Sequence, residues 1–487
     1  MTKLKNEDLL KEKAYIDGQW VGADGGATYE VLNPADGAVI GRVPAMGKAE
    51  TEKAIEVANK AFSAWAKKTA KERGKILNKW ADLIVDHADA LAALMTIEQG
   101  KPLAEARGEI IYGASFLEWF AEEGKRAYGD IIPSPIAGAR ILVQKQPIGV
   151  CGAITPWNFP SAMITRKVGP ALAAGCAIIC KPASETPFSA LALAVLAEEA
   201  GVPAGVFNIV TGNEPVPISG TMCDSNVVRK ISFTGSTAVG KILMRQSSKT
   251  LKKLSLELGG NAPFIVFDDA DIDAAVEAAI SCKYRNAGQT CVCANRIYVH
   301  DAVYDEFSEK FIAKVKGLKV GSGLEPDVTV GPMINEGGVK KAQEHVDDAK
   351  AKGAKVALGG KAHAKGGLFF EPTVLLETTA EMNIASEETF GPVAPLFRFK
   401  DEQEVIDLAN NTEYGLAAYF FAKDMARVWR VAESLEYGMV AVNTGILSTE
   451  VAPFGGVKHS GLGREGSKYG LDEYLEMKYI LMAGIDK

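Results

Sequence analysis

From residue 147 onward, short apolar runs alternate with helical stretches, and no other feature of the sequence limits the fold more. Such an alternation is typical of a parallel sheet that carries helices on both faces. The predicted strands are residues 149–154, 177–180, 206–210, 228–233 and 252–257. The predicted helices are residues 161–174, 187–200 and 236–247, and a short one after Asn213. We therefore predict an α/β fold with a doubly wound sheet, whose ligands bind beyond the carboxyl ends of the strands.

The remaining segments predict further elements around this sheet. Residues 1–50 carry the turn signals of short strands, and residues 48–127 have helical spacing, with one helix over 72–100 that ends at Gly100. A second α/β unit is expected from a strand at 262–267 to about residue 445. Its helices are expected near residues 302–316, 337–352, 402–410 and 424–436.

Two segments predict a surface for a second copy of the chain. Residues 131–146 read as a hairpin, and residues 474–487 form a final strand with nothing after it to cover it. An uncovered strand edge invites pairing with another chain. We therefore expect a homo-oligomer.

Composition and charge exclude several classes of protein. With 487 residues, 47% of them hydrophobic, the chain is too long for one core, so two or three domains are expected. The net charge is −7 and no Lys/Arg cluster points to nucleic acid. No apolar run reaches the roughly 20 residues of a membrane span, and the polar N-terminal stretch is not a signal peptide.

Seven cysteines, an odd count in a long chain, favour a reducing, cytoplasmic setting. The five histidines are scattered, so we expect no metal site.

A candidate nucleophile lies just after an amphipathic helix. The apolar face of this helix consists of Ile272, Ala275, Val276, Ala279 and Ile280. The carboxylates expected at its cap and first turn are Asp268, Asp269 and Asp271. The pattern breaks at residues 286–288, which places Cys291 on a loop fixed to a rigid helix, where a reactive side chain is useful. A cysteine taken alone is more often a small buried apolar residue.

Polar side chains follow the ends of the predicted strands. Asn158, on a stiff aromatic loop, carries an amide that suits an oxyanion, although Asn is also a common turn residue. Lys181 and Ser184 leave room for a nucleotide ribose with a 2′-phosphate, whereas an acidic residue there would favour NAD. Glu257 ends the fifth strand and is aimed at the same crevice, unless it is a solvated strand-end residue.

Three charged residues complete the candidate set. Glu388 lies on a tight loop of the second unit. Arg166 and Arg285 are solvated charges by default, but two arginines near the Cys291 loop would suit a substrate that bears a carboxylate.

Two glycine-rich stretches offer alternative phosphate loops. Residues 235–241, GSTAVGK, follow a predicted strand, but Ile242 stands where a Walker A loop has Ser or Thr. The hydroxyl that holds Mg²⁺ is therefore missing, which counts against a nucleotide triphosphatase. The helix that begins there can still bind a pyrophosphate at its N-terminus. Residues 461–466 fit G-x-G-x-x-G without the preceding apolar strand of a dinucleotide loop.

Six short motifs in register resemble the aldehyde dehydrogenase family over nearly the whole chain. They are PWNFP at 156–160, KPAS at 181–184, FTGS at 233–236, LELGG at 256–260, GQTC at 288–291 and EETFGP at 387–392. The resemblance implies that Cys291 is the nucleophile, that Asn158 and the backbone N–H of Cys291 hold the oxyanion, and that Glu257 activates the water that hydrolyses a thioester. A non-catalytic scaffold with this fold would not need all three side chains.

The same resemblance assigns the ligand contacts. The implied cofactor contacts are Thr155, Pro156, Trp157, Lys181, Ala183, Ser184, Gly235, Ser236, Leu258 and Glu388. The closest match is the NADP-preferring branch that oxidises succinate semialdehyde to succinate, where Arg166, Arg285 and Ser448 correspond to positions that bind the substrate carboxylate. Glu185 beside Ser184 opposes a 2′-phosphate, so NAD stays possible, and glutarate semialdehyde, one methylene longer, is the alternative substrate.

The resemblance also implies a division of the chain. An aldehyde dehydrogenase fold would have a doubly wound cofactor domain at 1–127 and 147–258, an α/β catalytic domain at 259–445 and an oligomerisation sheet from 128–146 and 470–487. The assembly would be a dimer or a tetramer. Cys293 lies two residues from Cys291, which raises the hypothesis of a strained, easily reduced disulfide under oxidation.

Overall fold

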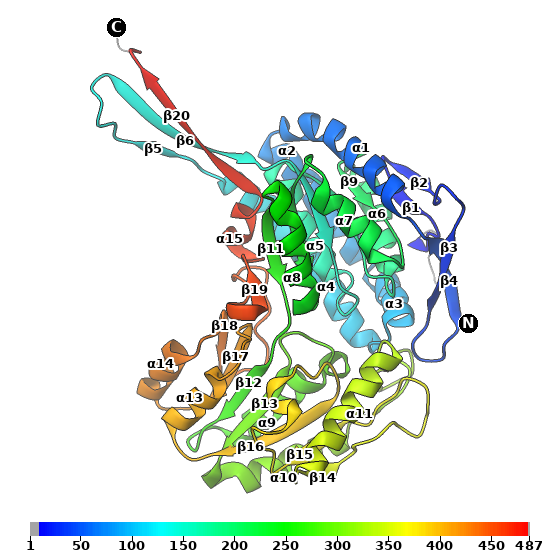
Figure 1. The fold of residues 1–487 in the computed structure, drawn as a ribbon, viewed down its shortest axis with the longest axis vertical. Coiled ribbons are helices and arrows are strands. Elements are labelled where there is room, and N and C mark those ends of the chain that lie inside the picture. The colour runs from blue at the N-terminus through cyan, green and yellow to red at the C-terminus, as the bar shows by residue number, and fades with distance from the viewer. Residues whose placement is uncertain (1–8, 486–487) are drawn as a thin grey trace.

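The computed structural model describes residues 9–485, which form two lobes, each built around a sheet, and a projecting arm (Figure 1). The first lobe contains the eight-stranded sheet β19-β11-β10-β7-β8-β9-β1-β2. Its parallel strands are β7 (Val150–Ile154), β8 (Ala177–Lys181), β9 (Phe207–Ile209), β10 (Val228–Thr234) and β11 (Lys253–Glu257). Its antiparallel strands are β1 (Ala14–Ile16), β2 (Gln19–Val21) and β19 (Gly461–Leu462). The predicted strands and the α/β class are confirmed.

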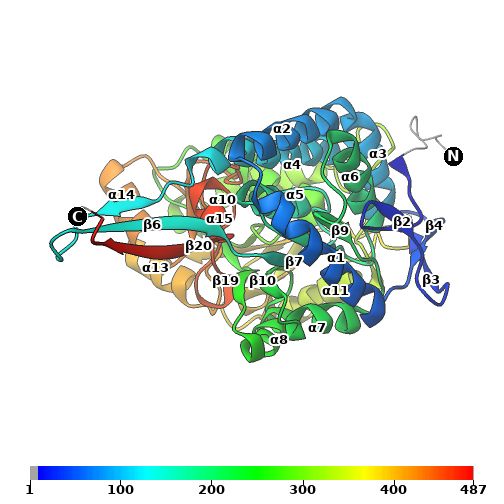
Figure 2. The ribbon, with the colours of Figure 1, turned by 90° about the horizontal axis from the view of Figure 1, so that it is seen from above.

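Helices cover both faces of this sheet (Figure 2). The helices are α1 (Lys48–Ala66), α2 (Ala70–Asp86), α3 (Ala88–Gln99), α4 (Leu103–Glu123), α5 (Ala162–Ala174), α6 (Pro187–Ala200), α7 (Pro215–Asp224) and α8 (Thr237–Ser247). Successive side chains of a strand point to opposite faces, and so Cys151 and Ala153 of β7 pack in the layer of α2 to α6, while Val150 and Ile154 pack in the layer of α1, α7 and α8. The doubly wound arrangement is thus present.

One helix prediction in this lobe is wrong. Residues 72–100 form two helices, because the chain breaks at His87, which has φ −101° and ψ 14°. His87 ends α2 and begins α3, and its Nδ1 lies 2.9 Å from Leu83 O. The apolar spacing runs through both helices, so the sequence gives no sign of the break. Gly100 ends α3 in the left-handed region, as expected.

The second lobe contains the seven-stranded sheet β14-β15-β16-β13-β12-β17-β18. The strands are β12 (Ala262–Val266), β13 (Ala294–His300), β14 (Lys355–Leu358), β15 (Thr373–Leu376), β16 (Val393–Phe399), β17 (Ala417–Phe421) and β18 (Met439–Val442). The helices are α9 (Ile272–Tyr284), α10 (Tyr304–Lys316), α11 (Glu336–Ala351), α12 (Asn383–Ser386), α13 (Glu402–Asn410) and α14 (Met425–Ser434). All of its strands except β14 pair in parallel.

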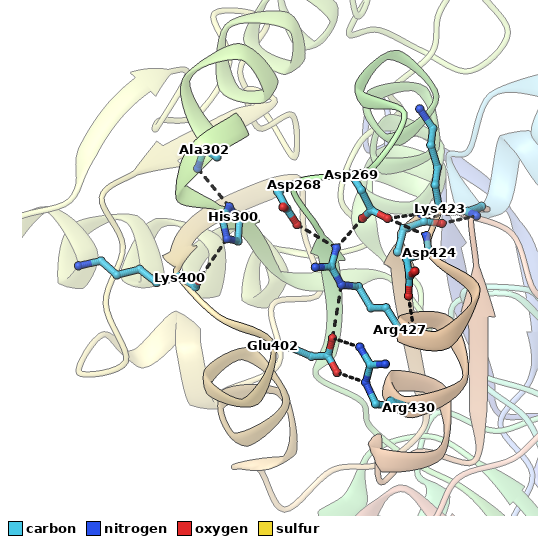
Figure 3. A network of polar contacts seen from close by, with 12 residues as sticks. Asp268, Asp269, His300, Ala302, Lys400, Glu402, Lys423, Asp424, Arg427 and Arg430 are labelled. Atoms are coloured by element: carbon cyan, nitrogen blue, oxygen red, sulfur yellow. Dashed lines mark hydrogen bonds and ion pairs between the residues drawn. The ribbon is translucent and has the colours of Figure 1, made fainter.

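Of the three carboxylates predicted to cap α9, only Asp271 does so. Asp271 is the N-cap and accepts a hydrogen bond from Ala274 N at 3.1 Å. Asp268 and Asp269 instead bind the guanidinium of Arg427, at 2.8 and 2.6 Å, and Glu402 joins this network from α13 (Figure 3). Arg427 lies on α14, about 160 residues later, and so the competing partner is not apparent from local sequence.

The arm is a three-stranded antiparallel sheet that projects from the first lobe (Figures 1 and 2). It joins β20 (Leu475–Ala483), β6 (Ala139–Pro147) and β5 (Asp130–Ile132), so the two segments predicted to form an oligomerisation sheet do pair with each other. Ile131 and Met477 on this arm are 80% and 76% exposed. An exposed apolar surface of this kind marks an interaction site. The predicted domain boundaries and the assembly itself stay predictions.

Candidate active site

Two cavities meet at Cys291, which lines both. The first, of about 330 Å³, is lined by Glu105, Gly108, Glu109, Tyr112, Phe159, Met163, Arg166, Arg285, Thr290, Cys291, Val292, Ser448 and Phe454. The second, of about 300 Å³, is lined by Pro156, Trp157, Asn158, Met163, Thr234, Gly235, Ser236, Leu258, Gly259, Cys291, Glu388 and Phe390. The structure therefore gathers most of the predicted site residues around one thiol.

Strand register explains why distant segments meet here. Ile154 of β7 is opposite both Lys181 of β8 and Phe233 of β10, and Thr234 is opposite Glu257 of β11. Neighbouring parallel strands thus end at the same edge of the sheet. The loops that carry the predicted residues leave from that edge, as expected for an open α/β sheet.

The Cys291 loop begins with an unusual backbone. After α9, Asn286 and Ala287 have φ 52° and 55° in the left-handed region, and Gly288 follows with φ 75°. A Cβ on Gly288 would lie 2.2 Å from Gly391 O, so only glycine fits there. Left-handed non-glycine residues persist only where the surroundings enforce them, and they concentrate at functional sites.

Burial controls the protonation of Cys291. It raises the pKa of the thiol to about 12, and the nearby carboxyl groups of Glu388 and Glu257 act in the same direction. The guanidinium groups of Arg166 and Arg285 oppose this rise. The thiol is therefore protonated at neutral pH in the cofactor-free protein.

The amide of Asn158 faces the Cys291 loop. Asn158 is buried, and its Nδ2 donates a hydrogen bond to Gln289 O at 3.1 Å. Its Oδ1 has no hydrogen-bond partner within residues 9–485. A primary amide has two N–H groups, and only one of them has an acceptor in the described chain. The second N–H is available to an oxyanion formed at Cys291.

Glu257 is not a solvated strand-end residue. It is 2% exposed, and neither carboxyl oxygen has a hydrogen-bond partner in the described part of the chain. Burial raises its pKa well above the ordinary value, and the neighbouring Glu465 carboxylate adds to this effect. Lys167, which forms an ion pair with Glu465 and donates to Thr234 Oγ1 at 2.7 Å, opposes it. A carboxyl group with a raised pKa in a partly dry site suits a general base.

Arg166 is held in a mostly aromatic cage. Its guanidinium lies 4.4 Å from the ring centre of Phe454 and 4.8 Å from that of Phe116, and its Nη2 donates to Tyr112 Oη at 2.7 Å. Its Nε has no partner among the residues that the structure describes. A buried guanidinium with a free donor is suited to bind an anion.

Arg285 and Ser448 border the same cavity. The Arg285 guanidinium lies 5.3 Å from the ring centre of Phe159 and forms no ion pair within the described chain. Ser448 adds a hydroxyl to the lining. The first cavity thus offers two cations and a hydroxyl at a short reach from the thiol.

The second cavity has aromatic and polar walls. Trp157 and Phe390 meet edge to face at 5.6 Å. Glu388 accepts from Gly260 N at 3.0 Å, and burial raises its pKa to about 7. Gly235 and Ser236 lead into α8, whose N-terminal dipole favours an anion.

Four of the predicted cofactor residues do not line this cavity. Thr155, Lys181, Ala183 and Ser184 lie at the ends of β7 and β8, next to the cavity wall in the sheet. Burial lowers the pKa of Lys181, and the Ser184 hydroxyl donates to Glu185 Oε2 at 3.0 Å. Their roles stay predictions.

The alternative motifs have other structural roles. Lys241 of GSTAVGK lies inside α8 and is exposed, and residues 461–466 comprise β19 and the turn that leads to the six-residue helix α15 (Ser467–Asp472). The first stretch still leads from β10 into the N-terminus of α8 but has its lysine inside the helix, and the second precedes only a short helix. Cys293 is buried and lines neither cavity, and its Sγ lies 3.5 Å from Lys283 O. The Cys291–Cys293 disulfide stays a prediction.

Several residues of the site had no sequence signal. Glu105 lies in the first turn of α4 and Tyr112 near its middle, where helical spacing is the only pattern. Glu465 lies in a glycine-rich stretch that suggested a phosphate loop. Lys167 could have been found only as the neighbour of Arg166 on α5. In residues 9–485, no three His, Cys, Asp or Glu side chains are grouped as a metal site would require, and no helix has the length and apolarity of a membrane span.

Comparisons with known proteins agree with this geometry. The profile described as "Aldehyde dehydrogenase family" matches residues 20–480. The chain is 62% identical over 478 residues to an NADP(+) succinate-semialdehyde dehydrogenase of Escherichia coli K12, covering 98% of this chain and 99% of that protein. It is 62% identical over 483 residues to a glutarate-semialdehyde dehydrogenase of Pseudomonas aeruginosa, covering 99% and 100%. The crystal structure of succinate-semialdehyde dehydrogenase from Burkholderia pseudomallei superposes with a TM-score of 0.98 at 62% identity, covering 99% and 100%.

Proposed function

Because this chain belongs to the aldehyde dehydrogenase family, we propose that it oxidises succinate semialdehyde to succinate with NADP as the electron acceptor. One observation carries the proposal. A single thiol, Cys291, borders both a cavity with two arginines and a cavity that leads to a helix N-terminus. An aldehyde that carries a carboxylate fits the first cavity, and a dinucleotide fits the second.

The residues of the chain then divide the reaction between them. The thiolate of Cys291 attacks the aldehyde carbon, while Asn158 and the backbone N–H of Cys291 bind the resulting oxyanion. The bound cofactor supplies the two-electron oxidant that converts the thiohemiacetal into a thioester. Glu257 then takes a proton from the water that attacks this thioester, and its unpartnered, buried carboxyl group supports that role.

The cofactor assignment rests on the residues present as well as on the relatives. Trp157, Leu258 and Phe390 offer apolar surface, Glu388 offers a carboxyl group, and the α8 N-terminus offers N–H donors to a pyrophosphate. Lys181 and Ser184 supply a cation and a hydroxyl for a 2′-phosphate, although the carboxylate of Glu185 lies beside them. NADP is therefore the preferred cofactor, with NAD as a weaker one.

Replacement of the thiol tests the mechanism. Cys291→Ala should abolish NADPH formation while cofactor binding, followed by tryptophan fluorescence, persists. Cys293→Ala is the matched control, because this buried thiol borders neither cavity, and it should retain activity. Turnover by Cys291→Ala would remove the mechanism.

Glutarate semialdehyde is the second candidate substrate. A relative with that name is as similar to this chain as the succinate-semialdehyde enzyme of E. coli, at 62% identity. One methylene changes selectivity by only about 1–3 kcal/mol. The ratio of kcat/KM for the two semialdehydes, each with NADP and with NAD, separates the two proposals, and a higher value for the longer substrate would replace succinate semialdehyde.

The assembly is part of the same proposal. We expect a homo-oligomer, a dimer or a tetramer, in which the arm of one copy contacts another, because its apolar side chains are exposed in the single chain. Met477→Asp with Tyr479→Asp should reduce the mass measured by light scattering, and an unchanged mass would contradict the proposal. The seven free thiols support a cytoplasmic location.

A further inference from the structure

We propose that Asn286 is a positioning residue of the oxyanion site, which orients the amide of Asn158 through a buried clamp between the two lobes. The proposal rests on the thioester chemistry proposed above, but not on the identity of the aldehyde. Asn286 contacts neither cavity, so its effect on the reaction has to pass through other residues.

The amide nitrogen of Asn286 bridges the two loops that form the oxyanion site. Its Nδ2 donates to Asn158 O at 3.0 Å and to Gln289 O at 3.2 Å. Gln289 O also accepts from Asn158 Nδ2 at 3.1 Å. The backbone carbonyl of Asn158 and the acceptor for its side chain are therefore fixed by one group. That arrangement sets the direction of the second N–H of Asn158, which is the one available to an oxyanion.

The remaining polar atoms of Asn286 are also bound. Its Oδ1 accepts from Gln99 Nε2 at 3.0 Å, and its N–H donates to Glu105 Oε2 at 2.8 Å. Gln99 and Glu105 belong to the first lobe, at the end of α3 and in α4, whereas Asn286 belongs to the second. The clamp thus ties the Cys291 loop to the lobe that carries Asn158.

A second layer of contacts makes the clamp rigid. Gln289 Nε2 donates to Asn286 O at 3.1 Å and to Pro332 O at 3.3 Å, and Gln289 Oε1 accepts from Ile334 N at 2.9 Å. Lys101 Nζ donates to Asn158 O at 2.7 Å. Asn286 itself is buried, with φ 52° in the left-handed region. Buried, fully satisfied polar networks fix a unique geometry, and Asn tolerates this backbone conformation better than most residues.

Two reactions of Cys291 separate a positioning role from general damage. With p-nitrophenyl acetate, the thiolate attacks the carbonyl carbon, a tetrahedral oxyanion forms, and p-nitrophenolate leaves an acetyl thioester. With iodoacetamide, the thiolate displaces iodide and no oxyanion forms. An oriented Asn158 amide therefore accelerates only the first reaction, whereas a distorted loop or an altered thiol pKa affects both.

The test compares both rates in Asn286→Asp, which keeps the shape of the side chain but removes the two Nδ2 donors. The rate of acylation by the ester divided by the rate of alkylation should fall about 10- to 100-fold, since a misplacement near 1 Å costs about that much. Any change of the thiol pKa that the new carboxyl group causes affects both rates and leaves this ratio unchanged. Gln99→Met, which releases Asn286 Oδ1, is a milder variant and should give a smaller change of the same sign. Asn443→Asp is the matched control, because Asn443 has φ 55° and pairs its amide with the backbone of Ala422. The ratio of ester acylation to alkylation in Asn443→Asp should stay at the wild-type value.

A double-mutant cycle identifies the route of the effect. If Asn286 acts through Asn158, then Asn286→Asp should add nothing to the loss of ester acylation in Asn158→Ala. Independent, additive losses would overturn the proposal, and so would equal losses of acylation and alkylation in Asn286→Asp and Gln99→Met. If the wild-type protein oxidises no semialdehyde, the proposed substrate is refuted. If Asn286→Asp then still alters the ratio of acylation to alkylation, this inference stands.

Discussion

Replacing Arg285 by methionine removes a guanidinium from the substrate cavity while a long apolar stem remains. In the structure this guanidinium lies near the ring of Phe159, borders the same cavity as Cys291 and forms no ion pair within residues 9–485. Its charge is thus available to a ligand, and Glu105, whose pKa burial raises and Arg285 helps to lower, keeps the Asn286 N–H and the Lys101 charge when Arg285 is removed. The variant should therefore report on substrate binding more than on folding.

The magnitude follows from the chemistry of one lost contact. A hydrogen bond between a guanidinium and a carboxylate contributes about 1.5–3 kcal/mol. At about 1.4 kcal/mol for each factor of ten, kcat/KM for succinate semialdehyde should fall about 10- to 150-fold. Butanal has the same chain length without the carboxylate, and its kcat/KM should change less than about 3-fold. The loss should appear mainly in KM, because this contact exists in both the ground and transition states.

The assay is initial-rate NADPH formation with both aldehydes, in wild type and in Arg285→Met. Arg430→Met is a suitable control, since Arg430 pairs with Glu402 at the surface, in the network of Figure 3. It should leave both substrates unchanged. Equal losses for succinate semialdehyde and butanal in Arg285→Met would refute the reasoning, because an effect independent of the carboxylate cannot arise from binding it.

Three further outcomes are expected. In the cofactor-free protein, alkylation of Cys291 by iodoacetamide should accelerate about tenfold per pH unit between pH 7 and about 11. The reason is that only the thiolate reacts and burial raises the thiol pKa to about 12. An alkylation rate independent of pH would contradict this. Glu257→Gln should give a rapid burst of NADPH and then a steady state slower by about 10²- to 10⁴-fold, because a general base contributes that much; loss of the burst would assign Glu257 another role. Glu185→Gln should raise the ratio of kcat/KM for NADP over NAD, because it removes a negative charge beside Ser184, and an unchanged ratio would place the 2′-phosphate elsewhere.

The sequence predicts best what is repeated or local. Apolar runs of four to six residues, separated by helical spacing, are enough to predict the parallel strands of the first sheet. Once these strands share an edge, residues at or just beyond their ends, such as Glu257 and Asn158, must approach one another. That is why side chains almost 100 residues apart can be assigned to one cleft without coordinates.

What the sequence does not predict depends on partners far along the chain. Asp268 and Asp269 have the local signature of helix caps, but both carboxylates form charge-assisted contacts with Arg427 instead. Tyr112 looks like any residue of a long helix until Arg166 is found 2.7 Å from its hydroxyl. The break at His87 is likewise invisible, because apolar spacing continues across it. In the first two cases a tertiary contact overrides a local rule.

The charges around Cys291 imply that the site is nearly inert until its ligands bind. A thiol whose pKa burial raises to about 12 is almost entirely protonated at pH 7. Burial also raises the pKa of Glu257, and this disfavours the charged form that accepts a proton. A cationic ring in the second cavity would favour the thiolate through Coulomb attraction, and roughly each 1.4 kcal/mol of that attraction lowers the thiol pKa by about one unit. Saturating NADP should therefore shift the alkylation profile of Cys291 to lower pH. A profile that does not move with cofactor would mean that the thiolate is generated by proton transfer after the aldehyde has bound.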